Sequence, residues 1–321
     1  MNLTVIVYHI SVILPQWTKF LICFLFIVIT MESERYNNNV VHHNYTEELT
    51  NEDKKYAMEY LNETDENREN DVAEIRRWLE DELRIRIDNF FILRFLRVCK
   101  FNLEKTKTRI RNYYKQLSHL PEWYLNKDPF RPELQELLDL GILLPLRKPD
   151  SQGRVVFLIR GTRHDPRIHT IPNLSKAFIL AIEMAMKYYP AASVYGCAMF
   201  FDVINPTIRH IFQFRPYVIM NMVHAWQSCY PMRYQTITVF NVPTFFDIVI
   251  RIMKSFMTEK MKNRFYVYSH RPQCFKDIPA NILPVEYGGT DGTMKELTEY
   301  WKKLIEENRD WLLRDENVKI E

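Results

Sequence analysis

Residues 230–269 constrain the fold of this chain more than any other segment. They begin with a run of β-branched and aromatic residues over residues 236–242, which Pro243 ends and which predicts a strand. The pattern then changes to that of a helix over residues 244–257, followed by basic residues and a second strand over residues 265–268. This order of elements predicts a βαβ unit, and therefore parallel strands with a helix packed on the sheet.

The helix predicted over residues 244–257 is unusual because apolar side chains cover most of its circumference. Its polar residues lie on a single stripe, formed by Asp247, Arg251, Lys254, Ser255 and Thr258. A surface helix needs only one apolar stripe, so this helix is either buried on two sides or closes an apolar cavity and meets a membrane. The second explanation is favoured by the basic cluster that follows, which consists of Lys260, Lys262 and Arg264.

Strand and helix patterns alternate from Gly153 to the end of the chain. Strands are predicted over residues 154–160 and 196–203, where the residues are almost all apolar. Helices are predicted over residues 173–189, 215–230 and 295–313. Continuously apolar strands separated by helices indicate an α/β fold with a mostly parallel mixed sheet that helices flank.

The segment before this sheet has the periodicity of helices only. A first helix is predicted around residues 53–61, and a second, with Asp71 as its N-cap, carries inward residues from Val72 to Leu83. Asp88 and Asn102 are expected to cap the next two helices. These four helices predict a small amino-terminal helical bundle.

The chain divides into five segments by composition and pattern. They are expected to be an apolar extension (1–30), an acidic and disordered stretch (31–50), a helical domain (51–121), the sheet domain (130–290) and a carboxy-terminal helix (291–321). The apolar runs of residues 1–30 lack the length, the basic start and the cleavage site of a transmembrane or signal segment. We therefore expect an upstream extension that the working protein lacks; the alternative is a signal anchor.

Charge is distributed unevenly along the chain. Residues 31–82 contain 6 basic and 16 acidic residues, residues 84–115 contain 10 and 2, and residues 207–271 contain 9 and 2. Because the whole chain carries only +3, the two basic blocks indicate an anionic partner surface such as lipid head groups or nucleic acid. The alternative is that they pair with the acidic segment.

Motifs for catalysis, metal binding and nucleic-acid binding are absent from the sequence. There is no GxGxxG after a strand, no phosphate-binding GxxxxGK[ST], no GxSxG and no HExxH, and no zinc-finger or helix-turn-helix signature. The five cysteines are widely spaced, which fits reduced thiols in a cytosolic protein. His164 and His169 are expected to be ordinary surface residues, and Asp202 to fix a loop. We expect no enzymatic activity, no metal, no cofactor and no nucleic-acid partner.

Three motifs in order resemble the CRAL-TRIO family of lipid-transfer proteins, which includes alpha-tocopherol transfer protein and cellular retinaldehyde-binding protein. FFILRFLRVCKFNLEKT (90–106) resembles the family's amino-terminal helical lead-in, and residues 230–269, with the run MTEKMKNRF, resemble its gate-helix region. NILPVEYGG (281–289) resembles its closing signature. The similarity spans roughly residues 50–312.

This resemblance implies a pocket for one hydrophobic ligand, with the helix over residues 244–257 as its gate. The positions that it turns toward the ligand are Phe178, Ile182, Cys197, Met199, Phe201, Met222, Ala225, Trp226, Phe246, Val249, Ile252 and Phe256. The alternative for all of these residues is ordinary core packing. Four polar residues are candidates for orienting the ligand: Tyr188, Tyr189, Ser193 and Gln227.

The resemblance also implies a phosphoinositide site beside the gate. Arg233, Lys260 and Arg264 match basic residues that hold phosphoinositide head groups in the tocopherol transfer protein. Cys99 and Gln235 stand where that relative has arginines, and Lys100 is a candidate to compensate for the first of these losses. The expected membrane partner is an anionic surface, with phosphatidylinositol bisphosphate as a candidate lipid.

Together these features predict a cytoplasmic protein, peripheral on membranes, that binds one isoprenoid, retinoid, tocopherol or other lipid and transfers it between membranes. The alternative is a lipid-sensing adaptor that recruits partners without net transfer. Transfer kinetics distinguish the two, because only a carrier must speed the movement of ligand between vesicles.

Overall fold

The computed structural model describes residues 49–85, 87–269, 275 and 278–314. The predictions for residues 1–30 and for nearly all of residues 31–50 concern parts of the chain outside these residues. The described residues form one compact unit.

Helices alone make up the first part of the described chain. They are α3 (Asn51–Leu61), α4 (Asp65–Trp78), α5 (Asn89–Val98) and α6 (Leu103–His119), with a π-helical turn at Leu79–Leu83 after α4. Asp88 and Asn102 cap α5 and α6 as predicted, through bonds of 2.7 and 2.9 Å from the backbone N–H groups three residues ahead. The prediction of Asp71 as a cap was wrong, because Thr64 and Asn67 form a reciprocal capping box one to two turns earlier.

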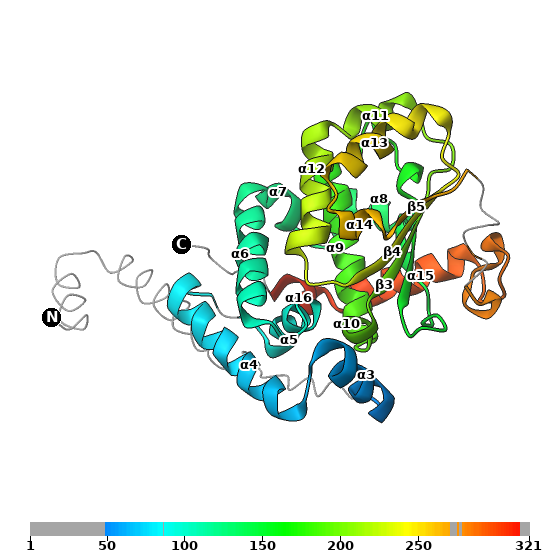
Figure 1. Cartoon of the computed structure of the whole chain (residues 1–321). Coiled ribbons are helices and arrows are strands. Elements are labelled where there is room, and N and C mark those ends of the chain that lie inside the picture. Colours follow the sequence, from blue (N-terminus) through cyan, green and yellow to red (C-terminus); the bar gives the residue numbers. More distant parts are fainter. Residues whose placement is uncertain (1–48, 86, 270–274, 276–277, 315–321) are drawn as a thin grey trace, which may run out of the picture. The chain divides into compact units, whose positions relative to one another are not determined.

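A mixed sheet of five strands in the order β1-β2-β3-β4-β5 follows (Figure 1). Its strands are β1 (Leu143–Pro145), β2 (Val155–Ile159), β3 (Cys197–Asp202), β4 (Tyr234–Phe240) and β5 (Phe265–Val267). Strands β2 to β5 are parallel, and β1 pairs with β2 antiparallel. The predicted α/β fold with a mostly parallel mixed sheet is confirmed.

Ten further helices accompany the sheet in the described residues (Figure 1). They are α7 (Pro121–Tyr124), α8 (Pro132–Asp139), α9 (Ile171–Tyr188), α10 (Ala192–Tyr195), α11 (Ile208–Gln213), α12 (Pro216–His224), α13 (Asp247–Phe256), α14 (Glu259–Lys262), α15 (Met294–Glu307) and α16 (Arg309–Leu313). The helix predicted over residues 215–230 ends in a π-helical turn, η3 (Ala225–Cys229), and the helix predicted over residues 244–257 begins with a 3₁₀ turn, η4 (Thr244–Phe246).

The two faces of the sheet have different environments. On one face Phe200 and Phe240 pack on Phe275. The centroid of the Phe275 ring lies 4.9 Å from that of Phe200 and 5.4 Å from that of Phe240. The other face carries Phe201 and Val239, which line a cavity. The sheet is therefore sealed on one side and hollowed on the other.

A bulge shifts the pairing between β3 and β4. Cys197 pairs with Tyr234, whereas the next residue, Ala198, pairs with Thr236, so Gln235 is the additional residue. Because side chains alternate along a strand, this extra residue brings Tyr234 to the same face as Ile237 and Val239.

The closing signature forms a tight loop before α15. The Gly288 backbone has φ +83°, and a Cβ on Gly289 would lie 2.0 Å from the carbonyl oxygen of Leu283. The loop therefore requires glycine at both positions. Thr293 then starts α15 with a capping box, so the glycine cluster is a turn into the last long helix.

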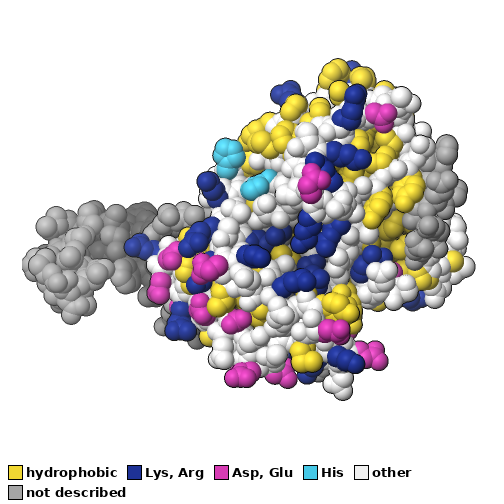
Figure 2. All heavy atoms as spheres, in the orientation of Figure 1, with side chains coloured by type: hydrophobic (Ala, Val, Ile, Leu, Met, Phe, Trp, Pro, Cys, Tyr) yellow, Lys and Arg dark blue, Asp and Glu magenta, His cyan; other side chains and the backbone are white. Residues whose placement is uncertain are grey.

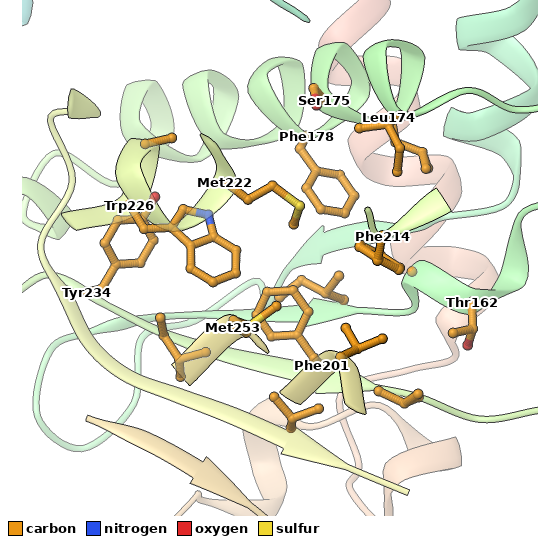
Figure 3. Close-up of a pocket in the computed structure, with 18 of the residues that line it drawn as sticks. Thr162, Leu174, Ser175, Phe178, Phe201, Phe214, Met222, Trp226, Tyr234 and Met253 are labelled. Atoms are coloured by element: carbon orange, nitrogen blue, oxygen red, sulfur yellow. The ribbon is translucent and has the colours of Figure 1, made fainter. Parts of the chain in front are cut away.

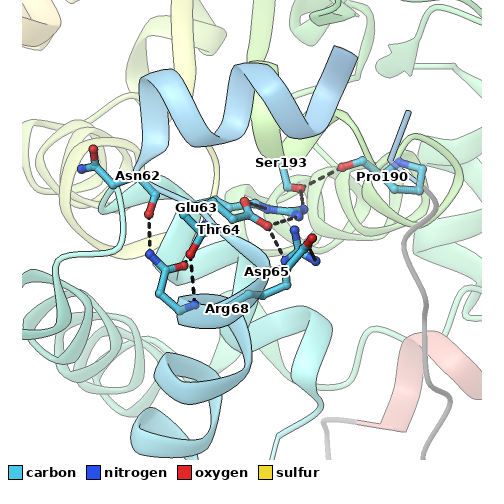
Figure 4. Close-up of polar contacts among 9 residues, drawn as sticks. Asn62, Glu63, Thr64, Asp65, Arg68, Pro190 and Ser193 are labelled. Carbon is cyan, nitrogen blue, oxygen red and sulfur yellow. Dashed lines mark hydrogen bonds and ion pairs between the residues drawn. The ribbon is translucent and has the colours of Figure 1, made fainter. Parts of the chain in front are cut away.

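The buried Arg97 connects the amino-terminal helices to the sheet region. Arg97 of α5 makes two bonds of 2.8 Å to Glu63, which precedes α4, and one of 2.6 Å to Ser193 of α10 (Figure 4). Arg68 adds a 2.6 Å bond to the same carboxylate. Burial raises the pKa of Glu63, but the hydrogen bonds and charges of Arg97 and Arg68 outweigh burial and hold this pKa below its ordinary value.

Other members of the first basic block also pair with the acidic helices. Lys107 lies 3.0 Å from Glu74, and Arg111 lies 2.7 Å from Glu82. Charge pairing within the protein, the alternative to an anionic partner, therefore accounts for much of the block at residues 84–115.

Removing Glu63 should destabilise the protein strongly. Glu63→Ala leaves the Arg97 guanidinium buried without its carboxylate, so we expect a loss of about 3–5 kcal/mol in the free energy of unfolding, measured by urea titration. Replacing both residues, as Glu63→Ala/Arg97→Met, should recover most of this loss. The control Glu59→Ala, at an exposed position of α3, should have little effect.

The same pair should make stability depend on pH. Because the pKa of Glu63 is lower in the folded than in the unfolded chain, its contribution is complete above the ordinary value of 4.5 and is lost as the pH falls through the folded value. Wild type should therefore lose stability on acidification more steeply than the double variant. Equal pH slopes would contradict this role for Glu63.

Candidate functional site

A cavity of about 170 Å³ lies on the hollowed face of the sheet, under α9, α12 and α13. One water molecule needs about 10–15 Å³ on this measure, so the cavity has room for a small organic molecule. Figure 3 shows aromatic and aliphatic side chains directed into it from the helices and from the sheet. No Lys, Arg or Glu side chain is among its lining residues in the described chain.

Eight of the twelve predicted ligand-contacting residues line this cavity. They are Phe178, Ile182, Phe201, Met222, Ala225, Trp226, Phe246 and Val249. They come from α9, β3, α12, η3, η4 and α13, segments far apart in the sequence. The structure therefore brings most of the predicted set together around one space.

The other four predicted residues lie outside the cavity lining. Cys197 and Met199 are buried in the first half of β3, whereas the cavity touches this strand only at its carboxyl end, from Phe201 onward. Ile252 and Phe256 are half-buried at the edge of the inward stripe of α13. Ile250 and Met253 line the cavity from this helix instead.

Six aromatic residues in the cavity wall were not predicted: Trp123, Tyr124, Phe214, Tyr230, Tyr234 and Phe265. Tyr234 faces the cavity because of the β-bulge, which strict alternation in the sequence does not show. Trp123 and Tyr124 come from α7, a single turn that starts at Pro121. A proline after a long amphipathic helix was the only signal for this turn.

The four polar residues proposed to orient a ligand are not in the cavity wall. Tyr189 donates to the Arg147 carbonyl at 2.6 Å, Ser193 binds Arg97, and Tyr188 is largely exposed. Gln227 instead fixes the end of the gate helix. These predictions were based on residue type alone, which does not show in which direction a side chain points in the folded protein.

Asp202 and the histidines have hydrogen-bond partners within the protein. Asp202 accepts bonds of 2.7 Å from Asn241 and 2.8 Å from Tyr287, so it fixes a loop as predicted. His164 contacts Gln213 at 2.7 Å, and His169 contacts Glu136 at 3.0 Å. Both histidines are buried, so the expectation of surface positions was wrong. No group of three potential metal ligands occurs within the described residues.

Helix α13 covers the cavity and has a second apolar side. Phe246, Val249 and Met253 face inward, while Phe245 and Ile248 are 48% and 46% exposed on the outer side. The helix is therefore apolar on two sides, one against the cavity and one against solvent.

Gln227 holds the carboxyl end of α13. Its side-chain amide donates to the Phe256 carbonyl at 3.1 Å, and its oxygen accepts from the Thr258 N–H at 3.0 Å. These are the backbone groups of the bend between α13 and α14, where helical hydrogen bonds end.

Exposed apolar side chains gather around the gate. Besides Phe245 and Ile248 they include Ile208, Phe212, Tyr217 and Met220 of α11 and α12. Figure 2 shows hydrophobic side chains over the region of α11 and α13, with Lys and Arg side chains below them on the same face. None of the described helices combines the length and the apolar composition that crossing a bilayer requires.

A second cavity, of about 120 Å³, lies next to the first and is basic. Its cationic lining residues are Lys100, Arg109, Arg233, Lys260 and Arg264, and no Asp or Glu of the described chain lines it. All four residues predicted to bind phosphoinositide are therefore in one place. Burial and then the charges of Arg264, Lys100, Arg109 and Arg233 lower the pKa of Lys260.

Arg109 was not predicted to belong to this group. Its guanidinium donates to the carbonyls of Trp226, Gln227 and Tyr230 at 3.2–3.3 Å, which fixes η3 and places its charge beside the cavity. Burial lowers the pKa of Arg109. In the sequence Arg109 is one of several basic residues on α6, and no motif or spacing distinguishes it from the others.

Lys100 reaches the second cavity because α5 has already ended at Val98. Lys100 has φ +54°, in the left-handed region, so the 100° turn per residue of a helix does not apply to it. Gln235 instead donates to the Tyr195 carbonyl at 3.0 Å.

The two cavities share a wall. Trp226 and Tyr234 line both of them, and their ring centroids are 6.3 Å apart. An apolar cavity under α13 thus lies next to a cluster of cations.

Comparison with known proteins agrees with this architecture. A family model described as CRAL/TRIO domain matches residues 141–289, and one described as Pinta-like, UBA domain matches residues 64–134. The alpha-tocopherol transfer protein-like protein of Mus musculus is 30% identical over 253 residues, which cover 78% of this chain and 72% of that protein. Clavesin-2 of Homo sapiens is 24% identical over 233 residues, or 71% of each chain.

A solved structure supports the fold independently. The crystal structure of Sfh5 aligns with a TM-score of 0.51 at 14% identity, covering 81% of this chain and 98% of that chain. The chain therefore belongs to the CRAL-TRIO family, whose members are generally lipid-binding and lipid-transfer proteins rather than enzymes.

Proposed function

We propose that this protein carries one hydrophobic ligand in the 170 Å³ cavity and exchanges it at membranes through α13. The observation that supports this most is an apolar cavity, lined by segments far apart in the sequence, with no Lys or Arg side chain in its described lining. Burial of apolar ligand surface contributes roughly 25 cal/mol per Å² to binding. Ligand contacts are assigned to the eight predicted residues that line this space, joined by Ile250, Met253 and Tyr234.

The gate role is assigned to α13 because this single helix lies between the cavity and solvent. Its outer residues Phe245 and Ile248 are held in water, which is unfavourable, and a bilayer would cover them. Contact with a membrane would then stabilise α13 away from the cavity.

The second cavity is assigned to the head group of an anionic lipid. Five cations line this cavity, with no carboxylate among the described lining residues, so each one raises the free-energy cost of burying the others. A bound phosphate would offset this cost. Phosphatidylinositol bisphosphate is the leading candidate, because adjacent phosphates match several separate cations. Arg233 and Arg264 also donate to the backbone carbonyls of Val194 and Tyr234, so Lys100 and Lys260 are the cations most free to bind.

These assignments describe a cytoplasmic protein that is peripheral on membranes. The helical domain over residues 51–121 has a hydrophobic core of its own between α4, α5 and α6, and the lipid-binding domain spans residues 130–290. The alternative function is a lipid-sensing adaptor, which would use the same cavities.

Filling the cavity should abolish ligand uptake. Ala225→Trp adds an indole to the cavity wall, whereas Ala73→Trp adds one to the exposed side of α4. Native mass spectrometry of the full chain after exposure to a total lipid extract should show one bound lipid in wild type and in the control, and none in Ala225→Trp. Equal uptake by both variants, with similar melting temperatures, would place the ligand elsewhere.

Transfer kinetics separate a carrier from an adaptor. Wild type at catalytic amounts should accelerate the movement of its extracted ligand between donor and acceptor vesicles, and Ala225→Trp should not. Stoichiometric binding without acceleration would favour the adaptor.

Neutralising the two lysines should weaken binding to anionic membranes. A basic side chain near such a surface contributes about 1 kcal/mol, so Lys100→Gln/Lys260→Gln should bind vesicles containing phosphatidylinositol bisphosphate at least about tenfold more weakly. Lys295→Gln/Lys303→Gln, with the same charge change on exposed positions of α15, is the control. An equal loss in both would mean general charge attraction without a site.

Polar substitution of the outer gate residues should weaken binding to neutral membranes. Phe245→Ser/Ile248→Ser removes two half-exposed apolar side chains, and we expect a partition coefficient into phosphatidylcholine vesicles lower by roughly tenfold, with ligand uptake unchanged. Met58→Ser/Tyr60→Ser, at exposed positions of α3, is the control. Unchanged partitioning would exclude α13 from the membrane contact.

A further inference from the structure

Three buried histidines pack together at the end of the 170 Å³ cavity that lies opposite Tyr234. His164, His169 and His210 are 3%, 5% and 2% exposed. The ring centroid of His164 lies 4.8 Å from that of His210 and 6.2 Å from that of His169. His164 also lines the cavity, together with Thr162, which Figure 3 shows at this end. The three histidines have no part in the proposed function.

The hydrogen-bond partners of His210 require its ring to be neutral. Its Nδ1 accepts from the Thr207 N–H at 2.9 Å, and its Nε2 donates to the His164 carbonyl at 3.2 Å. A ring nitrogen that accepts from a backbone N–H carries no proton, so the single ring hydrogen is on Nε2. The same holds for His169, whose Nδ1 accepts from the Asp165 N–H at 3.1 Å.

His164 has the opposite surroundings, because both of its ring nitrogens face acceptor oxygens. Its Nδ1 lies at the Gly161 carbonyl, and its Nε2 lies 2.7 Å from Oε1 of Gln213. The direction of the Gln213 amide is fixed, because its Nε2 donates to the carbonyls of Pro166 and His169 at 3.2 and 2.7 Å. A neutral imidazole can donate to only one of the two oxygens. His164 is therefore the ring of the three that takes up a proton without losing a hydrogen bond.

A second proton on the cluster has to go to a ring that is held neutral. On His210 it would lie between Nδ1 and the Thr207 N–H. The Thr207 hydroxyl, 2.8 Å from Nδ1, can turn to accept this proton, but the backbone N–H loses its acceptor. The proton would also place a second positive charge beside a charged His164. Burial and then His164 accordingly lower the pKa of His210.

Two carboxylates face the cluster, one from the same loop and one from α8. Asp165 raises the pKa of His210, but Arg167 already engages this carboxylate at 2.5–3.0 Å. Glu136 of α8 lies 3.0 Å from Nε2 of His169, and its side chain is 60% exposed. Neither carboxylate is hydrogen-bonded to His210 in the described structure, so neither stabilises a second proton there directly.

The same cluster fastens the short helix α11 to the loop over residues 161–170. His210 and Gln213, three residues apart on α11, bind the carbonyls of His164, Pro166 and His169, and Gln213 also binds the His164 ring. A positive charge on His210 weakens the attachment at the amino-terminal end of α11, where Thr207 is the N-cap.

Release of α11 would affect both the cavity and the surface. Phe214, directly after α11, lines the cavity, and its ring centroid lies 6.2 Å from that of Phe246 in the turn before α13. Ile208 and Phe212 on the outer side of α11 are 57% and 68% exposed. Figure 1 shows α11 beside α13. A detached α11 would therefore open the cavity at this end and present its apolar side chains together with those of α13.

We propose that His164 and His210 form a pH-operated switch, which holds α11 on the loop at neutral pH and releases it when a second proton enters the cluster. The released helix opens the end of the cavity and adds apolar side chains to the surface that contacts a bilayer. The switch itself is independent of the proposed function, and only its effect on membrane contact rests on that function.

The direction of the pH dependence follows from His210. Because its pKa in the closed state is below the ordinary value of 6.5, the closed state has its full advantage above pH 6.5. This advantage is lost as the pH falls from 6.5 through the folded value. If opening takes up one proton, the open population rises by up to about tenfold for each pH unit in this range.

Hydrogen–deuterium exchange of the full chain at about pH 7.5 and about pH 5 measures this opening. His210→Asn places an amide oxygen near the position of Nδ1, so it keeps an acceptor for the Thr207 N–H and cannot become charged. We expect similar protection of the amides of residues 208–214 in both proteins at the higher pH, and at least about fivefold less in wild type at the lower pH. His224→Asn, which removes a half-buried histidine of α12 whose pKa is also lowered, is the control and should behave like wild type.

Nuclear magnetic resonance of the chain with ¹⁵N-labelled histidine checks the starting geometry without relying on a variant. At neutral pH, His210 and His169 should each be neutral with the hydrogen on Nε2. A hydrogen on Nδ1 of His210 would overturn the switch, because the Thr207 N–H would then have no acceptor to lose.

Vesicles of phosphatidylcholine, which keep their net charge in this pH range, measure the consequence at a membrane. Wild type should partition into them roughly tenfold more strongly at about pH 5 than at about pH 7.5, and His210→Asn should not. Equal exchange of residues 208–214 in wild type and His210→Asn at about pH 5 would overturn the switch while the carrier function stands. Opening in acid without stronger partitioning would overturn the membrane effect alone. Opening in a protein that takes up no lipid at either pH would overturn the carrier function and leave the switch in place.

Discussion

Two buried arginines on α5 hold the helical domain against the lipid-binding domain. Arg94 contacts Glu183 of α9 at 2.7 and 3.1 Å, and Arg97 contacts Glu63 and Ser193. Burying these charges is favourable only when each is paired and hydrogen-bonded, so the Arg94–Glu183 pair and the Arg97–Ser193 bond, which both cross between the domains, favour one arrangement of the two. Tyr230 binds the Glu183 carboxylate and also lines the apolar cavity, so this arrangement extends to the cavity wall.

The sequence predicted the elements of the fold better than their ends. Caps at Asp88 and Asn102, the buried strands and the apolar helix α13 all follow from periodicity and side-chain chemistry, which act locally. The strand β1 was missed because three residues that end in Pro145 carry no periodic signal. Charge counting was less reliable: Arg94 and Arg97 raised the basic count of their block, yet both are buried against carboxylates from distant segments.

The candidate site was predictable where it depends on regular elements. Phe178 and Ile182, one turn apart on α9, line the same cavity, as helical spacing predicts. Tyr234 was not found because an additional residue in β4 reverses the alternation, and only the pairing with β3 reveals it. Arg109 was not found because its position beside the second cavity depends on how α6 packs against η3, which is a tertiary property.

The double bond of Gln227 to the bend after α13 has a consequence for the energetics of opening. In the closed state, one side chain saturates both the Phe256 carbonyl and the Thr258 N–H. In the proposed opening α13 swings away, and water must then take over both groups, because hydrocarbon cannot. The bend after α13 would therefore stay at the hydrated level of the lipid head groups while the apolar side of the helix enters the acyl region. This requirement would limit how deeply the protein inserts, and it would tilt α13 so that its amino-terminal end penetrates first.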